Sequence, residues 1–391
     1  MMETTRKTYK YKLRPTNTQE RTLWGWLHAC RHLYNTALEQ RKTAWKYHQV
    51  SLTRFQQEAE LKDIRSEFSE YASVHSHVLQ DVIARVDRAF QGYFRRVKSG
   101  EKAGYPRFQG INRYHSFTFK EYGNGARLDN GFLVLSKIGR IKVIWSRVIE
   151  GIPKTVTISQ ETDGWFVTFS CAEVPCQALP RTGNAVGIDV GLKSFLTTSD
   201  GEMVPNPRYY RKAEKTLKQA HKRVSRRKKG SHRRKKAIQL LRVAYQKVTR
   251  QREYFHHKTA RSLVQQYDVI YHEQLQVRNM VKNHYLAKSI SDAGWSQFLT
   301  ILQYKAACAG KEVLAVPARY TSQDCSNILP DGSICKERVP KSLSVRTHVC
   351  PTCGYVADRD ENAAMNIKWA GQALRGLVGI PAGLNRESVG L

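Results

Sequence analysis

Three acidic positions, each beside the expected end of a strand or start of a helix, are the residues of this chain best suited to chemistry. Asp189 lies in the apolar run GIDVG, and Glu273 ends the run VIYHE. Asp358 or Asp360 precedes the segment ENAAMNI. Carboxylate oxygens that converge from separate elements can hold two divalent cations and so hydrolyse a phosphodiester.

Each acid also has an ordinary interpretation as a helix cap or a surface residue. The position of Asp189 argues against this ordinary interpretation, because an unpaired carboxylate buried in an apolar strand costs folding free energy and favours a bound cation. The three positions together therefore indicate a metal site. The spacing does not choose between Asp358 and Asp360, since either could lie at the positive end of the following helix dipole.

Four of the eight cysteines gather between residues 325 and 353. Cys350 and Cys353 form a C-x-x-C knuckle before a glycine, whereas Cys325 and Cys335 are separated by nine residues that include a Pro-Asp-Gly turn. Four thiolates would close a tetrahedral, structural zinc site. The alternatives are four thiols without metal, or a site in which His348 replaces one cysteine.

The charge of the chain indicates a polyanionic partner. Its 391 residues contain 65 Lys and Arg against 33 Asp and Glu, a net charge of +32, which favours nucleic acid. Residues 208–261 alone hold 21 Lys and Arg against two Glu. A charge run is often only a solvated face, but this one favours contacts with a nucleic-acid backbone. We expect the contacts at its central turn, from Arg226, Arg227, Lys228, Lys229, Arg233 and Arg234.

No membrane association is expected, because the chain shows neither an apolar run long enough to span a bilayer nor a secretory signal. We therefore expect a cytoplasmic, nucleoid-associated protein of a prokaryote.

Alternating apolar and basic residues from Tyr9 to Leu13 predict a strand that Pro15 ends. Asn17, with Glu20 three residues on, could cap the next helix. Residues 16–105 are expected to be helical and residues 106–182 to be rich in β-strands. Since the first strand needs a sheet, residues 1–15 and 106–182 should form a β-barrel that carries the helical domain as an insertion.

From residue 183 strands alternate with helices, the α/β pattern. We expect this region to span 183–317 and to contain a basic helical hairpin at 208–261. A zinc ribbon at 318–356 and a helix at 357–370 follow. The glycine-containing tail, 371–391, should be poorly ordered.

Five runs of the sequence resemble the TnpB family in content and order: GIDVGLKSF, SISDAGW, YTSQDC, CPTCG and DRDENAAMNI. These are transposon-encoded, OrfB-type proteins related to type V CRISPR effector nucleases. The resemblance extends to YKYKLRPT near the N-terminus and to PRF at 106–108, so it covers nearly the whole chain. It implies a multidomain α+β protein: a RuvC-like nuclease domain of RNase H fold with an inserted zinc ribbon, and a β-barrel wedge domain with an inserted helical recognition domain.

The resemblance also implies an activity, that of an RNA-guided DNA endonuclease. Such a protein binds a guide RNA from its own transposon end, as one protein on one RNA. It recognises a short motif beside a double-stranded DNA target and cuts both strands with Mg²⁺ or Mn²⁺. By resemblance the catalytic acids are Asp189, Glu273 and Asp360, and Ser76 and Gln80 read the motif. The zinc is structural, although the family's first cysteine pair is usually tight and here is wide.

A second hypothesis is an RNA-guided DNA-binding repressor that has lost cleavage. The three acids argue against it, because a protein that only binds DNA has no need of them in a basic groove. A recombining transposase would need a tyrosine or serine nucleophile motif, and none is evident.

Overall fold

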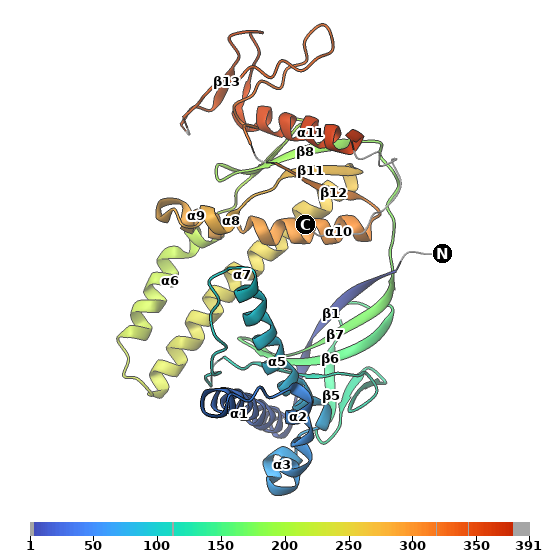
Figure 1. Ribbon diagram of the computed structural model, residues 1–391, viewed down its shortest axis with the longest axis vertical. Coiled ribbons are helices and arrows are strands. Elements are labelled where there is room, and N and C mark those ends of the chain that lie inside the picture. Colours follow the sequence, from blue (N-terminus) through green and yellow to red (C-terminus); the bar gives the residue numbers. More distant parts are fainter. Residues whose placement is uncertain (1–3, 112, 318, 343, 378–391) are drawn as a thin grey trace. The chain divides into compact units, whose positions relative to one another are not determined.

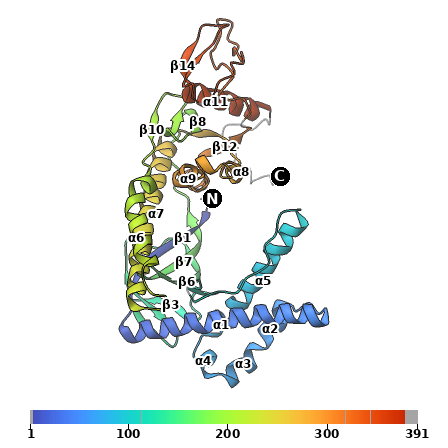
Figure 2. The same ribbon diagram turned by 90° about the vertical axis from the view of Figure 1, so that its left-hand side faces the viewer.

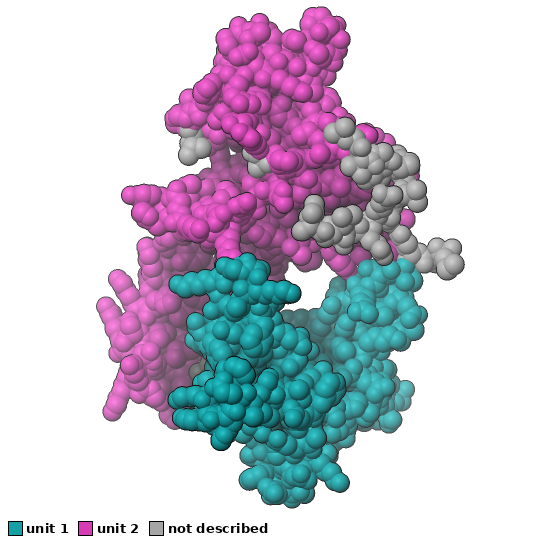
Figure 3. Space-filling view, in the orientation of Figure 1, with its two compact units in different colours: residues 1–175 teal, residues 176–391 magenta. Residues whose placement is uncertain are grey.

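The computed structural model describes residues 4–377 except 112, 318 and 343. The chain divides into two compact units, residues 1–175 and 176–391 (Figure 3). The expected disordered tail lies outside the described residues from residue 378 onward. Each unit is described by itself.

The first unit contains a seven-stranded antiparallel sheet with the order β2-β6-β7-β1-β5-β4-β3. The first strand of the chain lies near its centre, paired with β7 on one side and β5 on the other. The N-terminal strand therefore joins the later β-rich region, as expected. The strands are β1 (Thr4–Arg14), β2 (Ser116–Phe119), β3 (Ala126–Asp129), β4 (Phe132–Leu135), β5 (Gly139–Ile144), β6 (Ile152–Glu161) and β7 (Gly164–Pro175).

A barrel was expected here, but hydrogen bonding among the described strands leaves the sheet open, with β2 and β3 as its edges. The short strands β2 and β3 have only four residues each. Each pairs with a single neighbour, β2 with β6 and β3 with β4.

Five helices lie between β1 and β2 in the sequence, so the helical region is an insertion in the sheet, as expected. The long helices α1 and α5 bury apolar faces in the same core as the sheet; for example, the Trp26 ring lies 5.4 Å from the Phe117 ring. The helices are α1 (Asn17–His48), α2 (Arg54–Ala59), α3 (Leu61–Glu67), α4 (Ser69–Ala72) and α5 (Ser76–Lys98).

Thr16, not Asn17, caps the first helix. The Thr16 hydroxyl accepts the backbone N–H of Gln19, and the Gln19 side chain accepts the N–H of Thr16. Thr16 has the extended backbone that a capping residue needs (φ −70°, ψ 165°), whereas Asn17 is already helical.

The second unit contains a five-stranded mixed sheet with the order β10-β9-β8-β11-β12. The strands are β8 (Ala185–Val190), β9 (Ser194–Thr198), β10 (Met203–Pro205), β11 (Val269–Glu273) and β12 (Glu312–Val316). Strands β8, β11 and β12 run parallel to one another. Strand β9 pairs antiparallel with β8, and β10 pairs antiparallel with β9 at the edge of the sheet.

Helices cover both faces of this sheet (Figure 1). Val186, Ile188 and Ile270 point into a core shared with α7 (His232–Gln266) and α10 (Trp295–Cys308). Their neighbours Val269 and Tyr271 point to the other face, into a core shared with Ile367 of α11 (Arg359–Leu377). Helix α11 was expected to end at residue 370, but it continues to Leu377, because Gly371 is buried against the ring of Tyr271.

The basic segment forms a helical hairpin, as expected. Helices α6 (Tyr209–Ser225) and α7 lie side by side (Figures 1 and 2), joined by the turn 226–231. Two short helices, α8 (Val277–Met280) and α9 (His284–Ala293), lead into α10.

The cysteine-rich segment lies between β12 and α11. It is built from the two-stranded sheet of β13 (Thr347–Val349) and β14 (Val356–Asp358) and from two isolated bridges, Asp324 with Arg338 and Ile328 with Ile334. Among the helices that the structure describes, none is long and apolar enough to cross a membrane.

Candidate active site and cysteine cluster

The parallel register of β8 and β11 brings two of the three acids together. Ile188 lies opposite His272, so Asp189 and Glu273, one residue further on, are neighbours at the same end of the two strands. Because side chains alternate along a strand, both acids point to the face that α11 covers, as do Gly187 and Tyr271.

Helix α11 packs very closely on this face. A Cβ atom at Gly187 would lie 2.0 Å from the carbonyl oxygen of Ala364, and one at Gly371 would lie 2.0 Å from the Tyr271 ring. Ala363 and Ala364 are themselves fully buried. Small residues on both elements thus let the helix lie against the strands, and its N-terminal end brings Asp360 to the two acids of the sheet.

The structure distinguishes the two aspartates at the start of α11. One oxygen of Asp358 accepts the backbone N–H of Asp360 at 2.8 Å, the pattern of a helix-capping side chain. Asp360 lies close enough to Asp189 to raise the pKa of that carboxyl group. The Asp360 carboxylate also lies 3.4 Å from the guanidinium of Arg346.

Crowding of the acids is visible in their electrostatics. Burial, followed by repulsion from Glu273 and Asp360, holds the pKa of Asp189 well above its ordinary value. Burial also raises the pKa of Glu273, and a hydrogen bond from Thr321 opposes that shift. Carboxylates held together in this way are a donor set suited to hard divalent cations, which would relieve their repulsion.

Thr321 is a functional candidate that the sequence did not single out. Its buried hydroxyl donates to one carboxylate oxygen of Glu273. Two asparagines of α11 hold the loop that carries Thr321. The Asn366 side chain donates to the backbone carbonyls of Thr321 and Asp324. The Asn362 side chain donates to the carbonyl of Asp324 and accepts the N–H of Ser326. The same helix that supplies Asp360 therefore fixes the partner of Glu273.

These residues lie within the runs YTSQDC and DRDENAAMNI, but a hydroxyl and two amides have no spacing that indicates a role. Only the fold shows that the first run passes beside Glu273 and along one face of α11.

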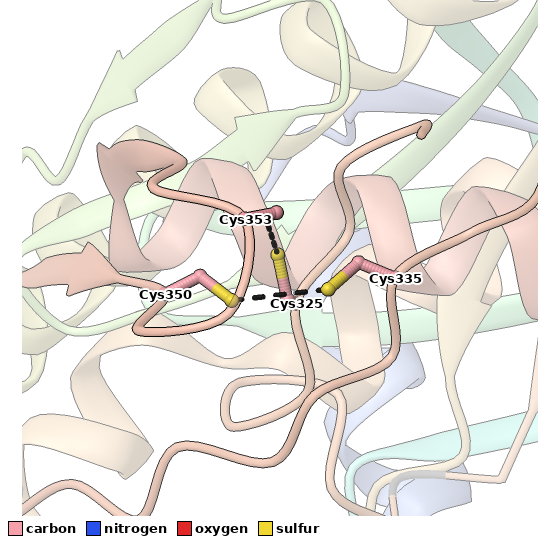
Figure 4. A group of neighbouring side chains, drawn as sticks. All are labelled: Cys325, Cys335, Cys350 and Cys353. Atoms are coloured by element: carbon pink, nitrogen blue, oxygen red, sulfur yellow. Dashed lines mark hydrogen bonds between the residues drawn. The ribbon is translucent and has the colours of Figure 1, made fainter. Parts of the chain in front are cut away.

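The four clustered cysteines converge. Their sulfur atoms all lie within 4.8 Å of one another (Figure 4). The distances are 3.6 Å between Cys325 and Cys353 and 3.8 Å between Cys335 and Cys350. Four sulfurs at about 2.3 Å from a tetrahedral zinc are separated by about 3.8 Å, so the cluster is consistent with a structural zinc site. His348 does not belong to this group among the described residues; its Nδ1 lies beside the Lys341 amine.

A β-hairpin explains the wide spacing of the first pair. The N–H of Cys325 donates to Glu337, and the N–H of Cys335 donates to Asn327. The residues between the two cysteines thus fold back on themselves through a turn at Gly332 (φ 82°), which brings the two sulfurs to the same end. The second pair is tight, with Gly354 (φ 72°) donating to the carbonyl of Cys350.

The other expected binding residues are far from the carboxylates in the sequence and come from other elements. Arg226, Arg227, Lys228 and Lys229 are exposed in the turn between α6 and α7, and Arg233 is exposed at the start of α7. Arg234 instead closes the turn, donating to the carbonyls of Val224 and Arg227. In the other unit, Ser76 is the first residue of α5 and Gln80 lies one turn later, both partly buried.

Three known families match parts of the chain. Residues 151–284 match a family described as "Probable transposase" of the OrfB type, residues 295–367 match "Cas12f1-like, TNB domain", and residues 1–49 match "Helix-turn-helix domain". The last description does not fit this structure, in which residues 4–48 form one strand and one long helix.

Two relatives span almost the whole chain. A Streptomyces pristinaespiralis protein named "Putative RNA-guided DNA endonuclease" is 35% identical over 380 residues, covering 95% of this chain and 91% of its own. A similarly named protein of Escherichia coli K12, InsQ, is 28% identical and covers 94% of this chain and 92% of its own.

A solved structure shares the fold. The mini-RNA-guided endonuclease CRISPR-Cas phi3 superposes with a TM-score of 0.51 at 11% identity, over 97% of this chain and 93% of its own. This chain, which consists of two compact units of mixed α and β structure, is thus similar in its fold to that endonuclease.

Proposed function

The chain belongs to the TnpB family of OrfB-type, transposon-encoded proteins, and from this premise we propose that it is an RNA-guided DNA endonuclease. One observation carries the proposal: Asp189, Glu273 and Asp360 come from three separate elements to one end of a sheet. They do so in a chain whose net charge of +32 suits a nucleic-acid partner.

The catalytic acids would hold two divalent cations, Mg²⁺ or Mn²⁺. When bound, these cations activate water and stabilise the leaving oxygen of a phosphodiester. The protein's own residues supply the rigidity: β8 and β11 fix two acids, α11 fixes the third, and Thr321 holds one oxygen of Glu273 so that the other stays available.

The remaining parts follow the family's organisation. Residues 183–317 and 357–370 would form a RuvC-like nuclease domain of RNase H fold, with residues 318–356 as a zinc ribbon held by Cys325, Cys335, Cys350 and Cys353. Residues 1–15 and 106–182 would form the wedge domain, and residues 16–105 the recognition domain, where Ser76 and Gln80 read the target-adjacent motif.

The partners would be a guide RNA from the transposon end and a double-stranded DNA target. One protein would bind one RNA, and the complex would act at the nucleoid.

Removal of single acids tests the proposal. The protein is purified with its copurifying RNA, and that RNA is sequenced to design a matching duplex. We expect Asp189→Ala and Glu273→Ala to abolish cleavage with Mg²⁺ while duplex binding stays within about twofold, because the phosphate contacts lie elsewhere.

Cutting by either variant at near wild-type rates would refute the assignment of the acids. A wild-type complex that binds its duplex without cutting it would instead support the guided repressor.

A further inference from the structure

Two adjoining hollows in the second unit have many more cationic than acidic residues in their walls. One, of about 440 Å³, includes Lys193, Arg208, Arg211 and Arg346 in its wall. The other, of about 500 Å³, lies along α6 and includes Lys215, Lys218 and Lys222. Arg211 lines both. The two walls together contain seven cationic and two acidic residues, so an anion is the ligand that they suit.

The cations of α6 form a single stripe. Arg211, Lys215, Lys218 and Lys222 are spaced four, three and four residues apart, which places them on one face of the helix, and all are exposed. The partly or fully buried residues that face α7 are Ala213, Leu217, Ala220 and Val224. These lie two residues out of phase, on the opposite side of the helix. The stripe therefore points away from the core.

The two acids in the hollows neutralise only part of this stripe. Both oxygens of buried Asp292 accept backbone N–H groups, from Tyr210 and Arg211 at the start of α6. Glu214 is shared between Lys218, at 3.1 Å, and Lys288, at 2.8 Å. Among the residues that the structure describes, no carboxylate pairs with Lys215 or Lys222.

Arg208 and Arg211 are positioned by neutral groups, which leaves their charge available. The Arg211 guanidinium donates to the Ser289 hydroxyl at 3.0 Å. The Arg208 guanidinium donates to the carbonyl of Leu192 at 3.3 Å. Guanidinium groups held in this way are preorganised for phosphate oxygens.

One end of the stripe reaches the candidate active site. The wall of the first hollow includes Leu192 and Lys193, which follow Asp189 directly after β8. It also includes Arg346, whose guanidinium lies 3.4 Å from the Asp360 carboxylate. A strand whose phosphate lay at the three acids would pass into this hollow.

We propose that the stripe of α6 together with Lys193 and Arg208, here called the α6 track, binds the sugar-phosphate backbone of the DNA strand being cut. This rests on the proposed function and adds where the substrate strand runs. From residue 211 to residue 222 the helix rises about 16 Å. That length accommodates several phosphates, since a stacked strand carries one about every 3.4 Å. The track makes no base contact and should be independent of sequence.

The test compares two triple variants that remove equal charge. The track variant carries Arg211→Gln, Lys215→Gln and Lys222→Gln, and the tip variant carries Arg226→Gln, Arg227→Gln and Lys228→Gln. Glutamine has nearly the helix propensity of Lys and Arg. Each protein is saturated with its copurifying RNA. Binding of a labelled oligothymidylate of about 16 nucleotides is then measured without added Mg²⁺ or Mn²⁺ and without chelator, so that a structural zinc is not removed, over a range of salt concentrations.

We expect the track variant to lose about tenfold or more in affinity for oligothymidylate. The slope of log affinity against log salt concentration should become smaller by about 2, because three phosphate contacts are lost and each contributes roughly 0.7. Its affinity for the RNA should be unchanged, and single-turnover cleavage of a matched duplex should slow. The RNA-saturated tip variant should bind oligothymidylate like wild type.

Two results would overturn the proposal. The tip variant is expected to bind the copurifying RNA more weakly. If the track variant loses RNA affinity to a similar extent, the track holds the guide RNA instead. If its oligothymidylate affinity and salt slope equal those of wild type, the track is only a solvated face. Because binding is measured without Mg²⁺ or Mn²⁺, it does not depend on cleavage, and the binding result stands even if the wild-type complex proves not to be a nuclease.

Discussion

At the scale of single residues, the candidate active site depends on side chains that touch the acids as much as on the acids themselves. Thr321 donates to Glu273, and Asn362 and Asn366 hold the loop that presents it. A carboxylate with one oxygen fixed in this way has fewer rotamers to lose when it binds a cation, so its position is set in advance.

Thr321→Val should therefore slow single-turnover cleavage by about tenfold, the equivalent of about 1.4 kcal/mol, because valine has the shape of threonine without the donor. Thr321→Ser retains the hydroxyl and should stay within about threefold of wild type. The rates are measured at saturating Mg²⁺ with equal guide loading. Equal rates for the two variants would show that the hydroxyl does not position Glu273.

The two aspartates at the start of α11 should differ in effect. Asp360→Ala should be inactive, whereas Asp358→Ala should keep at least partial cleavage and lose about 1 kcal/mol of stability through the missing cap. Asp358→Asn, which can still cap, should retain most of that stability. Single-turnover cleavage rates and thermal unfolding of the three variants show which aspartate is the catalytic acid. An inactive Asp358→Ala together with an active Asp360→Ala would assign that role to Asp358 instead.

Residue types predicted the acids and the thiols but not their partners. Asp189 was conspicuous because a charge interrupts an apolar strand, and the cysteines because they cluster. Thr321 carried no such signal, since a threonine in a loop is common and its contact with Glu273 spans 48 positions of the chain. The capping residue was misplaced by one position, because Thr16 and Asn17 are both good caps and only the backbone at Thr16 is extended.

At the scale of elements, the close approach of α11 to the sheet positions Asp360. Gly187 and Gly371 make this approach possible, and neither has a positive φ. Their role is to leave space for the opposing helix backbone and for the Tyr271 ring.

Gly187→Ala should lower stability by about 1–3 kcal/mol and reduce cleavage strongly, because its Cβ would meet the backbone of α11, which cannot rotate away. Gly376→Ala is the control: Gly376 lies in α11 itself, nothing lies within 4 Å of a Cβ built there, and the variant should be neutral or slightly stabilising. Thermal unfolding and cleavage rates are measured for both. A Gly187→Ala protein as stable and active as wild type would show that α11 is not held as closely as the structure indicates.

An ion pair at the opposite end of the sheet predicts a pH dependence. Asp268, just before β11, accepts the buried Lys311 amine and the N–H groups of Thr182 and Gly183. Although burial opposes them, these contacts lower its pKa from 3.8 to about 2. A depressed pKa stabilises the fold above the unfolded value, so about 2 kcal/mol should be present above about pH 4 and lost as the pH falls toward 2.

Asp268→Asn should thus be less stable than wild type at pH 6, and the difference should shrink toward pH 2. Urea unfolding at pH 6, 4 and 2.5 follows the difference, with the exposed Asp63→Asn as the control. A difference that did not change with pH would mean that the asparagine acts through packing alone.

Elements with a regular alternation of apolar and polar residues could be predicted from the sequence. The pairing of strands that are distant in the sequence could be predicted only in part. The alternation at Tyr9–Leu13 appears as β1, and the β-rich region expected at residues 106–182 contains β2 to β7. The sheet was expected to close into a barrel, but it is open. Closure requires hydrogen bonds between the two edge strands, and the sequence pattern of a single strand does not show which strand it pairs with.

At the scale of the whole molecule, the charge is unevenly distributed along the chain. Residues 208–261 carry an excess of 19 positive charges, out of a net charge of +32 for all residues. In the structure this segment is α6, α7 and the turn between them, so much of the excess is displayed on a two-helix projection with little apolar surface to bury. Such a projection suits a phosphate backbone and has no means of reading sequence.

Neutralising its tip with Arg226→Gln, Arg227→Gln, Lys228→Gln and Lys229→Gln should weaken binding of the copurifying RNA and of an unrelated RNA of equal length by similar factors. The slope of log affinity against log salt should fall by about 3, from four contacts at roughly 0.7 each. A charge-conserving variant, Arg226→Lys with Arg227→Lys, should keep the slope, because only charge is needed at a backbone contact. Loss of binding confined to one RNA would indicate recognition of its sequence, and an unchanged slope in the fourfold variant would mean that the tip makes no phosphate contact.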